Sequence, residues 1–135
     1  MESLELFLHP VEREHEKFVV SDRFVDQEGQ AVAWELRPVT AEENDYLMRR
    51  NTKQTPSGNH QLDESSYRHE FTAAGVVWPN LDDAALQQHY GVMGRSALLK
   101  KMLLAGEMMA LYRKVSALSG FGKENKSKVE EIKNA

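Results

Sequence analysis

The chain has 135 residues, of which 41% are hydrophobic and 28% charged, with a formal net charge of −4 and no cysteine. This length fits one domain with a sizeable buried core. The acidic balance argues against nonspecific nucleic-acid binding, and the lack of cysteine excludes disulfides, thiolate metal sites and cysteine nucleophiles. The acidic N-terminus does not resemble a signal peptide, and no apolar run is long enough to span a membrane.

Charge is unevenly distributed along the chain. Residues 1–90 carry 8 Lys and Arg against 17 Asp and Glu, whereas residues 91–123 carry 6 against 1. A basic segment in an acidic protein favours self-association or an acidic partner. Ion pairing between the two parts of one chain explains the same asymmetry equally well, so both interpretations stay open.

The first half of the chain predicts a β-hairpin followed by a helix. Residues 17–39 contain two runs rich in β-branched and aromatic residues, separated by a turn sequence at 26–30, and we expect a hairpin there. Thr40 and Glu43 have the spacing of a capping box, which predicts a helix over 41–50. Residues 51–61 lack periodicity and are expected to form a mobile surface loop.

Two further helices are predicted before residue 91. Tyr67, Phe71, Ala74 and Trp78 follow helical spacing, which predicts a helix over 64–78 that ends at Pro79. A shorter helix is expected over 82–90. Trp78, like Trp34, is expected to be a core residue.

Residues 95–118 predict a single long helix, because they are dense in strong helix formers and contain no proline. At about 100° per residue, Lys100, Glu107 and Lys114 form one narrow polar stripe with apolar side chains on both sides. Such a helix is either central to the fold or shares one face with another molecule. The expected fold is α+β, with one domain over residues 1–122 in which the hairpin packs on a mostly helical body. The charged tail, 123–135, is expected to be a frayed helix or disordered.

The sequence offers no arrangement of reactive side chains that points to an enzyme. The five histidines are scattered, and none has metal-ligand spacing with another. The glycines at 91 and 94 precede a helix but lack the Gly-Lys-Ser/Thr of a phosphate-binding loop. We therefore expect no catalytic residue, no metal site and no cofactor.

Four of the six methionines lie between residues 93 and 109, and methionine-rich surfaces accept varied partners. For any single methionine, filling the protein's own core is the simpler explanation. The candidate partner-binding residues on the long helix are Leu99, Met102, Leu103, Met108, Met109 and Tyr112.

Several motifs together resemble the XkdN-like family of phage tail assembly chaperones. They are Trp34-Glu-Leu-Arg-Pro38, Val77-Trp-Pro-Asn-Leu-Asp-Asp-Ala-Ala-Leu-Gln-Gln-His-Tyr-Gly-Val92 and Leu98-Leu-Lys-Lys-Met-Leu-Leu-Ala-Gly-Glu107. The resemblance spans nearly the whole chain. It implies a protein of tailed phages or prophages of Gram-positive bacteria that coats the tape-measure protein, helps to recruit tail tube subunits in the host cytoplasm and leaves the finished tail. It implies no active site. In related systems a translational frameshift gives a longer form, and the charged tail would be its junction.

Our hypothesis from the sequence is a non-enzymatic tail assembly chaperone. Its expected partners are the tape-measure protein, the tail tube protein as a further candidate, and other copies of itself, but neither nucleic acid nor membrane. Two alternatives belong to other classes: a structural tail or connector component retained in the virion, and a regulatory adaptor that binds a host protein.

Overall fold

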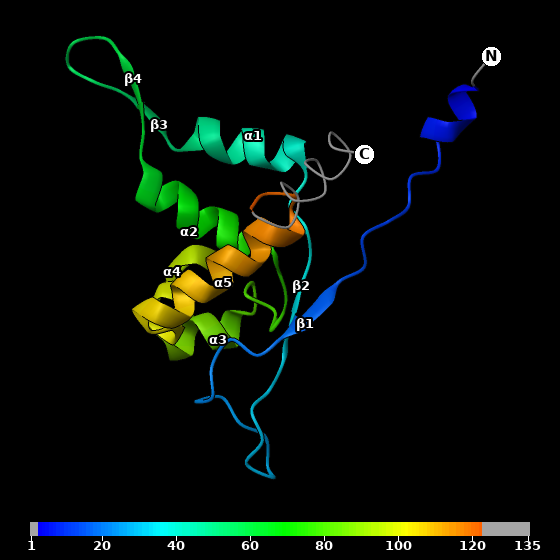
Figure 1. The fold of residues 1–135 in the computed structure, drawn as a ribbon. Coiled ribbons are helices and arrows are strands. Elements are labelled where there is room, and N and C mark those ends of the chain that lie inside the picture. Colours follow the sequence, from blue (N-terminus) through cyan, green and yellow to red (C-terminus); the bar gives the residue numbers. More distant parts are fainter. Residues whose placement is uncertain (1–2, 123–135) are drawn as a thin grey trace.

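The computed structural model describes residues 3–122, and its mixture of helices and short strands confirms the predicted α+β class (Figure 1). In chain order the elements are η1 (Leu4–Phe7), β1 (Glu16–Phe18), β2 (Trp34–Leu36), α1 (Ala41–Arg50), β3 (Thr52–Gln54), β4 (His60–Leu62), α2 (Glu64–Ala74), β5 (Val76–Trp78), α3 (Ala84–His89), α4 (Arg95–Met102) and α5 (Ala105–Leu118). The predicted tail, 123–135, lies outside the described residues.

The central strand β2 belongs to an antiparallel sheet with the order β1-β2-β5. Phe18 of β1 pairs with Trp34, and Val76 of β5 pairs with Leu36. Trp34 and Leu36 are buried, whereas Glu35 between them is half-exposed, as strand alternation requires. Because Trp34 and Leu36 belong to the same core as the helices, the predicted hairpin packs against the helical body.

The hairpin predicted over 17–39 has short regular strands and a long connection. Beyond β1 and β2, only Val25 and Ala31 form a further bridge. The turn lies where the sequence predicts it: the Asp26 carboxylate accepts hydrogen bonds from the amides of Glu28 and Gln30 at 2.8 and 3.0 Å. An Asp that bonds the backbone two residues on is a typical turn former.

Helix α1 spans Ala41–Arg50, and both hydrogen bonds of its predicted capping box form. The Glu43 amide donates to the Thr40 hydroxyl at 3.2 Å, and the Thr40 amide donates to the Glu43 carboxylate at 3.1 Å. Arg37 also pairs with this carboxylate and lowers the pKa of Glu43 to about 2. Local sequence thus defines the start of this helix completely.

The helix predicted over 64–78 is too long. Helix α2 ends at Ala74, and Val76–Trp78 form β5, the third strand of the sheet. Helical spacing of aromatic residues conceals this strand, because its hydrogen-bond partner β2 is remote in sequence. The strand has a consequence for Trp78, which is 50% exposed rather than a core residue.

The loop predicted over 51–61 is a second hairpin. β3 pairs with β4 in antiparallel register, and the pair projects from the helical body (Figure 1). Its turn is closed by a hydrogen bond from the Thr55 amide to the Asn59 carbonyl at 2.7 Å, and Gly58 has a positive φ of 89°. The sequence prediction missed it because every residue of β3 is exposed, so no apolar alternation marks the strand.

The single helix predicted over 95–118 is also wrong. Leu103 and Leu104 are both extended, and they separate α4 from α5. Two side chains hold the break. Arg23, which lies outside both helices, donates to the Met102 carbonyl at 2.9 Å, and Glu107 in the first turn of α5 accepts from the Leu104 amide at 2.8 Å. An ion pair between Arg23 and Glu107 joins these two contacts, so backbone groups left free by the break are satisfied.

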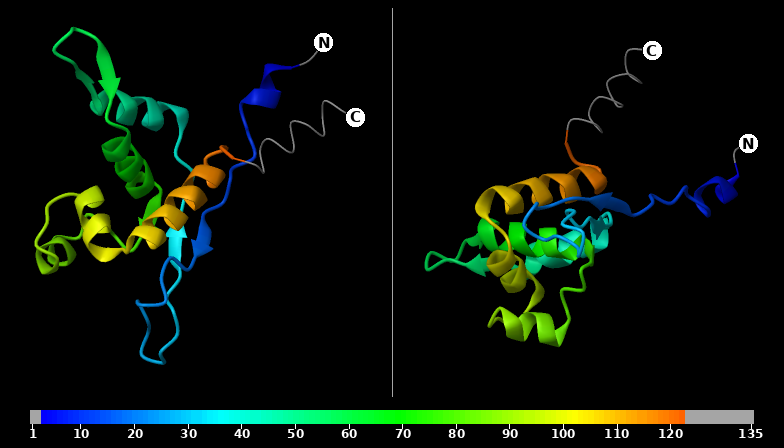
Figure 2. Two further views of the ribbon diagram at one scale, coloured as in Figure 1. Left: turned by 60° about the vertical axis from the view of Figure 1, so that its left-hand side comes forward. Right: turned by 90° about the horizontal axis from the view of Figure 1, so that it is seen from below.

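The buried apolar residues form one contiguous core between the sheet and helices α2, α4 and α5. Its fully buried side chains include Leu98 and Leu99 of α4 and Leu111 and Val115 of α5. Figure 2 shows α5 crossing the body beside the sheet, while the N-terminal segment projects away from it. The two halves of the predicted long helix therefore share one core.

Candidate partner-binding surface

An open groove of about 370 Å³ lies between α2 and the junction of α4 with α5. We call it the α2–α5 groove. Its lining residues are Arg68, His69, Lys100, Leu103, Ala105, Met108, Met109 and Tyr112. They come from α2, α4 and α5 and, in the case of Leu103, from the break between α4 and α5.

The floor of the groove is apolar. Ala105, Met108, Met109 and Tyr112 follow helical spacing on α5, so their side chains share one face. Tyr112 packs edge-on against Phe71 of α2, with ring centroids 6.0 Å apart, which anchors α5 to α2. Met109 is 38% exposed, and Met108 and Tyr112 are half-buried. Accessible methionines on a rigid helix form an adaptable apolar contact surface.

The rim of the groove is basic. The Arg68 guanidinium lies 5.8 Å from the centre of the Tyr112 ring, and Lys100 lines the groove from α4. Burial, followed by the nearby cations Lys100 and Arg68, lowers the pKa of His69, so this side chain is mainly neutral at pH 7. Arg68 and Lys100 make no ion pair with any carboxylate of residues 3–122. An apolar floor with a cationic rim suits a peptide segment that carries both apolar side chains and carboxylates.

The structure divides the six candidate partner-binding residues into two groups. Leu103, Met108, Met109 and Tyr112 line the α2–α5 groove. Leu99 and Met102 are core residues, 0% and 6% exposed, and do not line the groove. Arg68, His69, Lys100 and Ala105 were missing from the sequence-based set. For Arg68 and His69 no local signal exists, because α2 reaches the groove only through the tertiary fold.

The charge asymmetry of the sequence is partly explained within the chain. Arg95 pairs with Asp82 at 2.9 Å, and Lys114 pairs with Glu16 at 2.7 Å. Glu107, the acidic residue of the basic segment, pairs with Arg23, which lowers the pKa of Glu107 to about 2. Arg95 and Lys114 are therefore paired within the chain, whereas Lys100 lies at the groove rim.

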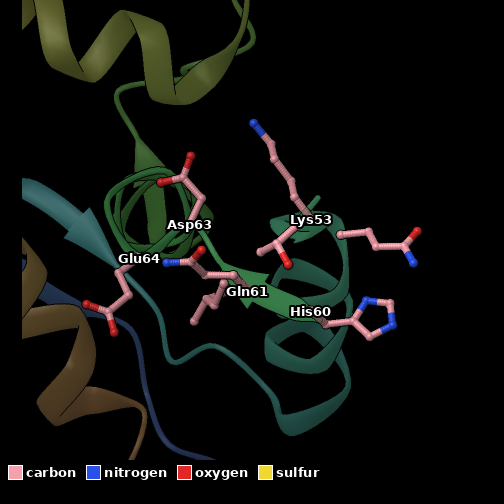
Figure 3. A pocket seen from close by; sticks show the side chains of 8 residues that line it. Lys53, His60, Gln61, Asp63 and Glu64 are labelled. Carbon is pink, nitrogen blue, oxygen red and sulfur yellow. The ribbon is translucent and has the colours of Figure 1, made fainter. Parts of the chain in front are cut away.

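A larger hollow, of about 880 Å³, lies beside the β3–β4 hairpin and is mainly polar. Figure 3 shows that its labelled side chains point apart: the carboxylates of Asp63 and Glu64 diverge, and the His60 ring faces away from both. This geometry does not assemble an acid, a base and a nucleophile around one point.

Within the part of the chain that the structure describes, no group of three or more His, Asp or Glu side chains is placed to hold a metal ion. Among residues 3–122, no helix is long and apolar enough to cross a membrane.

The fold is a small α+β domain with an open groove between α2 and the α4–α5 junction. Residues 4–133 match the family described as "Phage XkdN-like tail assembly chaperone protein, TAC". The chain belongs to this family of phage tail assembly chaperones, which is a family of chaperones rather than of enzymes.

Individual relatives agree with this assignment. The chain is 26% identical over 129 residues to the phage-like element PBSX protein XkdN of Bacillus subtilis strain 168, a match that covers 92% of this chain and 87% of XkdN. The uncharacterised protein YqbN of the same strain matches with the same identity and coverage. The crystal structure of YqbN superposes with a TM-score of 0.78 at 22% identity and covers 90% of this chain and 99% of YqbN, which shows that the fold is shared.

Proposed function

We propose that this chain binds the tape-measure protein in the host cytoplasm, keeps it soluble, assists assembly of the tail tube around it and is absent from the finished tail. Membership of the tail assembly chaperone family carries the proposal. The α2–α5 groove supplies the contact surface: Met108, Met109 and Tyr112 receive apolar side chains, and Arg68 and Lys100 attract neighbouring carboxylates.

The shape and chemistry of the groove support a helical client. An amphipathic helix presents apolar anchors on one face, and such a face packs into an apolar groove. A long tape-measure protein offers many such segments in series, so several copies of the chaperone can bind along one client. Weak individual contacts then combine into stable but reversible coating.

Co-expression with the tape-measure protein of the same phage or prophage tests the proposal. We expect the tape-measure protein to become soluble and to co-purify with the wild-type chain. Met109→Asp places a carboxylate on the groove floor and should reduce the co-purified tape-measure protein at least tenfold. Met93→Asp is the matched control, because Met93 is 91% exposed and does not line the groove. Circular dichroism should show the same helix content in both variants.

Two results would count against the proposal. One is a tape-measure protein that stays aggregated while the wild-type chain is soluble and folded. The other is loss of binding that is equal in the Met93 and Met109 variants. The structural-component alternative is tested separately by proteomics of purified particles, in which a chaperone is missing and a tail component is present in stoichiometric amounts. Recovery of a host protein without the tape measure would favour the adaptor alternative.

A further inference from the structure

The first described residues form an arm that projects from the body and is itself exposed to solvent. Every residue from 3 to 15 is exposed, and the large apolar side chains in this stretch are each at least 65% exposed. They are Leu4, Leu6, Phe7, Leu8 and Val11. Figures 1 and 2 show this segment, in blue, projecting from the N-terminal end of β1 away from the helices. A contiguous exposed apolar segment of this kind is typical of an interaction site. We call residues 3–14 the N-terminal arm.

The arm is acidic as well as apolar. It carries the carboxylates of Glu5, Glu12 and Glu14 and one guanidinium, that of Arg13. Arg13 donates a hydrogen bond to the Leu118 carbonyl at 3.0 Å and so ties the base of the arm to the end of α5. The outer part of the arm, from Leu4 to Leu8, thus combines four apolar side chains with one carboxylate.

The α2–α5 groove complements this arm in both polarity and charge. Its apolar floor is bordered by Arg68 and Lys100. Three hollows beside α1 carry carboxylates: one contains Glu42 and Glu43, another contains Asp45, and the third contains Glu70. The two arginines of the third hollow, Arg50 and Arg95, already pair with Glu70 and Asp82. Like charges would oppose the arm at those places.

The direction of the arm favours a groove on another molecule. The arm leaves the body beside the C-terminal end of α5, whereas the groove lies at the N-terminal end of α5. In both views of Figure 2 the arm points away from the α4–α5 junction. An arm that extends from one copy is placed to reach a neighbouring copy, and reciprocal exchange between two copies would bury both arms.

We infer that the N-terminal arm docks in the α2–α5 groove of a second copy of this chain. The leucine and phenylalanine side chains between residues 4 and 8 contact Met108, Met109 and Tyr112, and the carboxylate of Glu5 lies towards Arg68 and Lys100. One consequence rests on the proposed function: the arm and a tape-measure segment compete for one groove, so self-association keeps the groove covered until a client displaces the arm.

Site-specific cross-linking tests the inference with the full-length chain. Because the chain has no native cysteine, Phe7→Cys can be introduced into one tagged preparation and Met109→Cys into another of different tag size. The mixture is treated with a short bismaleimide. We expect a heterodimer of the two tagged chains, and we expect Leu6→Asp in the arm-bearing chain to reduce its yield at least fivefold. Met93→Cys in place of Met109→Cys is the control, because its thiol is more exposed yet lies outside the groove.

The outcomes separate the possibilities. If Phe7→Cys cross-links with Met93→Cys as efficiently as with Met109→Cys, the inference is overturned. So does a chain carrying both Phe7→Cys and Met109→Cys that cross-links only within itself, with a yield independent of concentration. Light scattering should show at least a tenfold weaker self-association for Leu6→Asp, and an unchanged association would also overturn it. These measurements contain no tape-measure protein, so they succeed or fail independently of the proposed function. Loss of the heterodimer on adding tape-measure protein supports competition, and persistence at saturating tape measure refutes it.

Discussion

The contact between Gly75 and Val115 offers a sharp test of how α2 meets α5. A Cβ added at Gly75 would lie 2.4 Å from Cγ1 and 2.8 Å from Cγ2 of Val115, which is closer than atoms can approach. Gly75 has a φ of −84°, which alanine adopts readily, so the cost of Gly75→Ala comes from packing and not from the backbone. Overpacking of this kind destabilises by about 1–3 kcal/mol.

The partner substitution opens the space that the new methyl group needs. Val115 is fully buried, and Val115→Ala removes two methyl groups, at about 0.8 kcal/mol each plus the energy of the cavity, or about 2–3 kcal/mol in total. If the two effects were independent, the double variant would lose about 3–6 kcal/mol, with a midpoint of about 4.5 kcal/mol. We expect a loss of only about 2–3 kcal/mol, because the methyl added at Gly75 occupies space vacated by Val115. Some strain remains, because Val115 Cβ would still lie 3.1 Å from the new methyl group.

Gly75→Ala, Val115→Ala, the double variant and the wild type form a double-mutant cycle. Urea denaturation, monitored by tryptophan fluorescence and circular dichroism, gives the free energy of unfolding of each. A coupling of about 2 kcal/mol in favour of the double variant supports the close approach. Strict additivity would show that α2 and α5 are farther apart than the structure places them. The result bears on function as well, because these two helices form opposite sides of the α2–α5 groove.

Two further predictions concern helix starts and pH. Thr40→Ala should lower the free energy of unfolding by about 1 kcal/mol because it removes the N-cap acceptor of α1, whereas Thr40→Ser should be nearly neutral in the same denaturation assay. Arg23 lowers the folded-state pKa of Glu107 from 4.5 to about 2, so the stabilisation by this ion pair is complete above about pH 4.5 and is lost as the pH falls towards 2. Acid titration of Tm should therefore show a weaker dependence between pH 5 and 2 for Glu107→Gln than for the wild type, and equal slopes would contradict the assigned ion pair.

Sequence patterns predicted those features whose causes are local. The start of α1 follows from Thr40 and Glu43, which are three residues apart and bond each other's backbone amides. The inward face of β2 follows from the alternation of Trp34 and Leu36 about Glu35. In each case the residues that specify the structure are neighbours, so the pattern is visible without knowledge of the fold.

The missed features have distant causes. The break between α4 and α5 is held by Arg23, which lies 84 residues before Glu107. β5 exists because β2 offers it hydrogen-bond partners, and Gly75 is the one local signal that α2 ends there. The candidate site divides in the same way: Met108, Met109 and Tyr112 were found from helical spacing, whereas Arg68 of α2 joins them only in the folded chain.

The break also changes what the two apolar faces of residues 95–118 mean. In one straight helix, Leu99 and Val115 would point about 160° apart, at roughly 100° per residue. Both are fully buried, and a straight helix could achieve this only by lying between two apolar layers. Two extended residues at 103 and 104 reorient the second half so that a single core covers both. The double-faced pattern is thus accounted for within one molecule and is no evidence for a partner. The large apolar side chains of this segment that remain exposed after this rearrangement are Leu104 at the break and Met109 in the groove, at 60% and 38%. Together with the N-terminal arm, they are the candidates for contact with a partner.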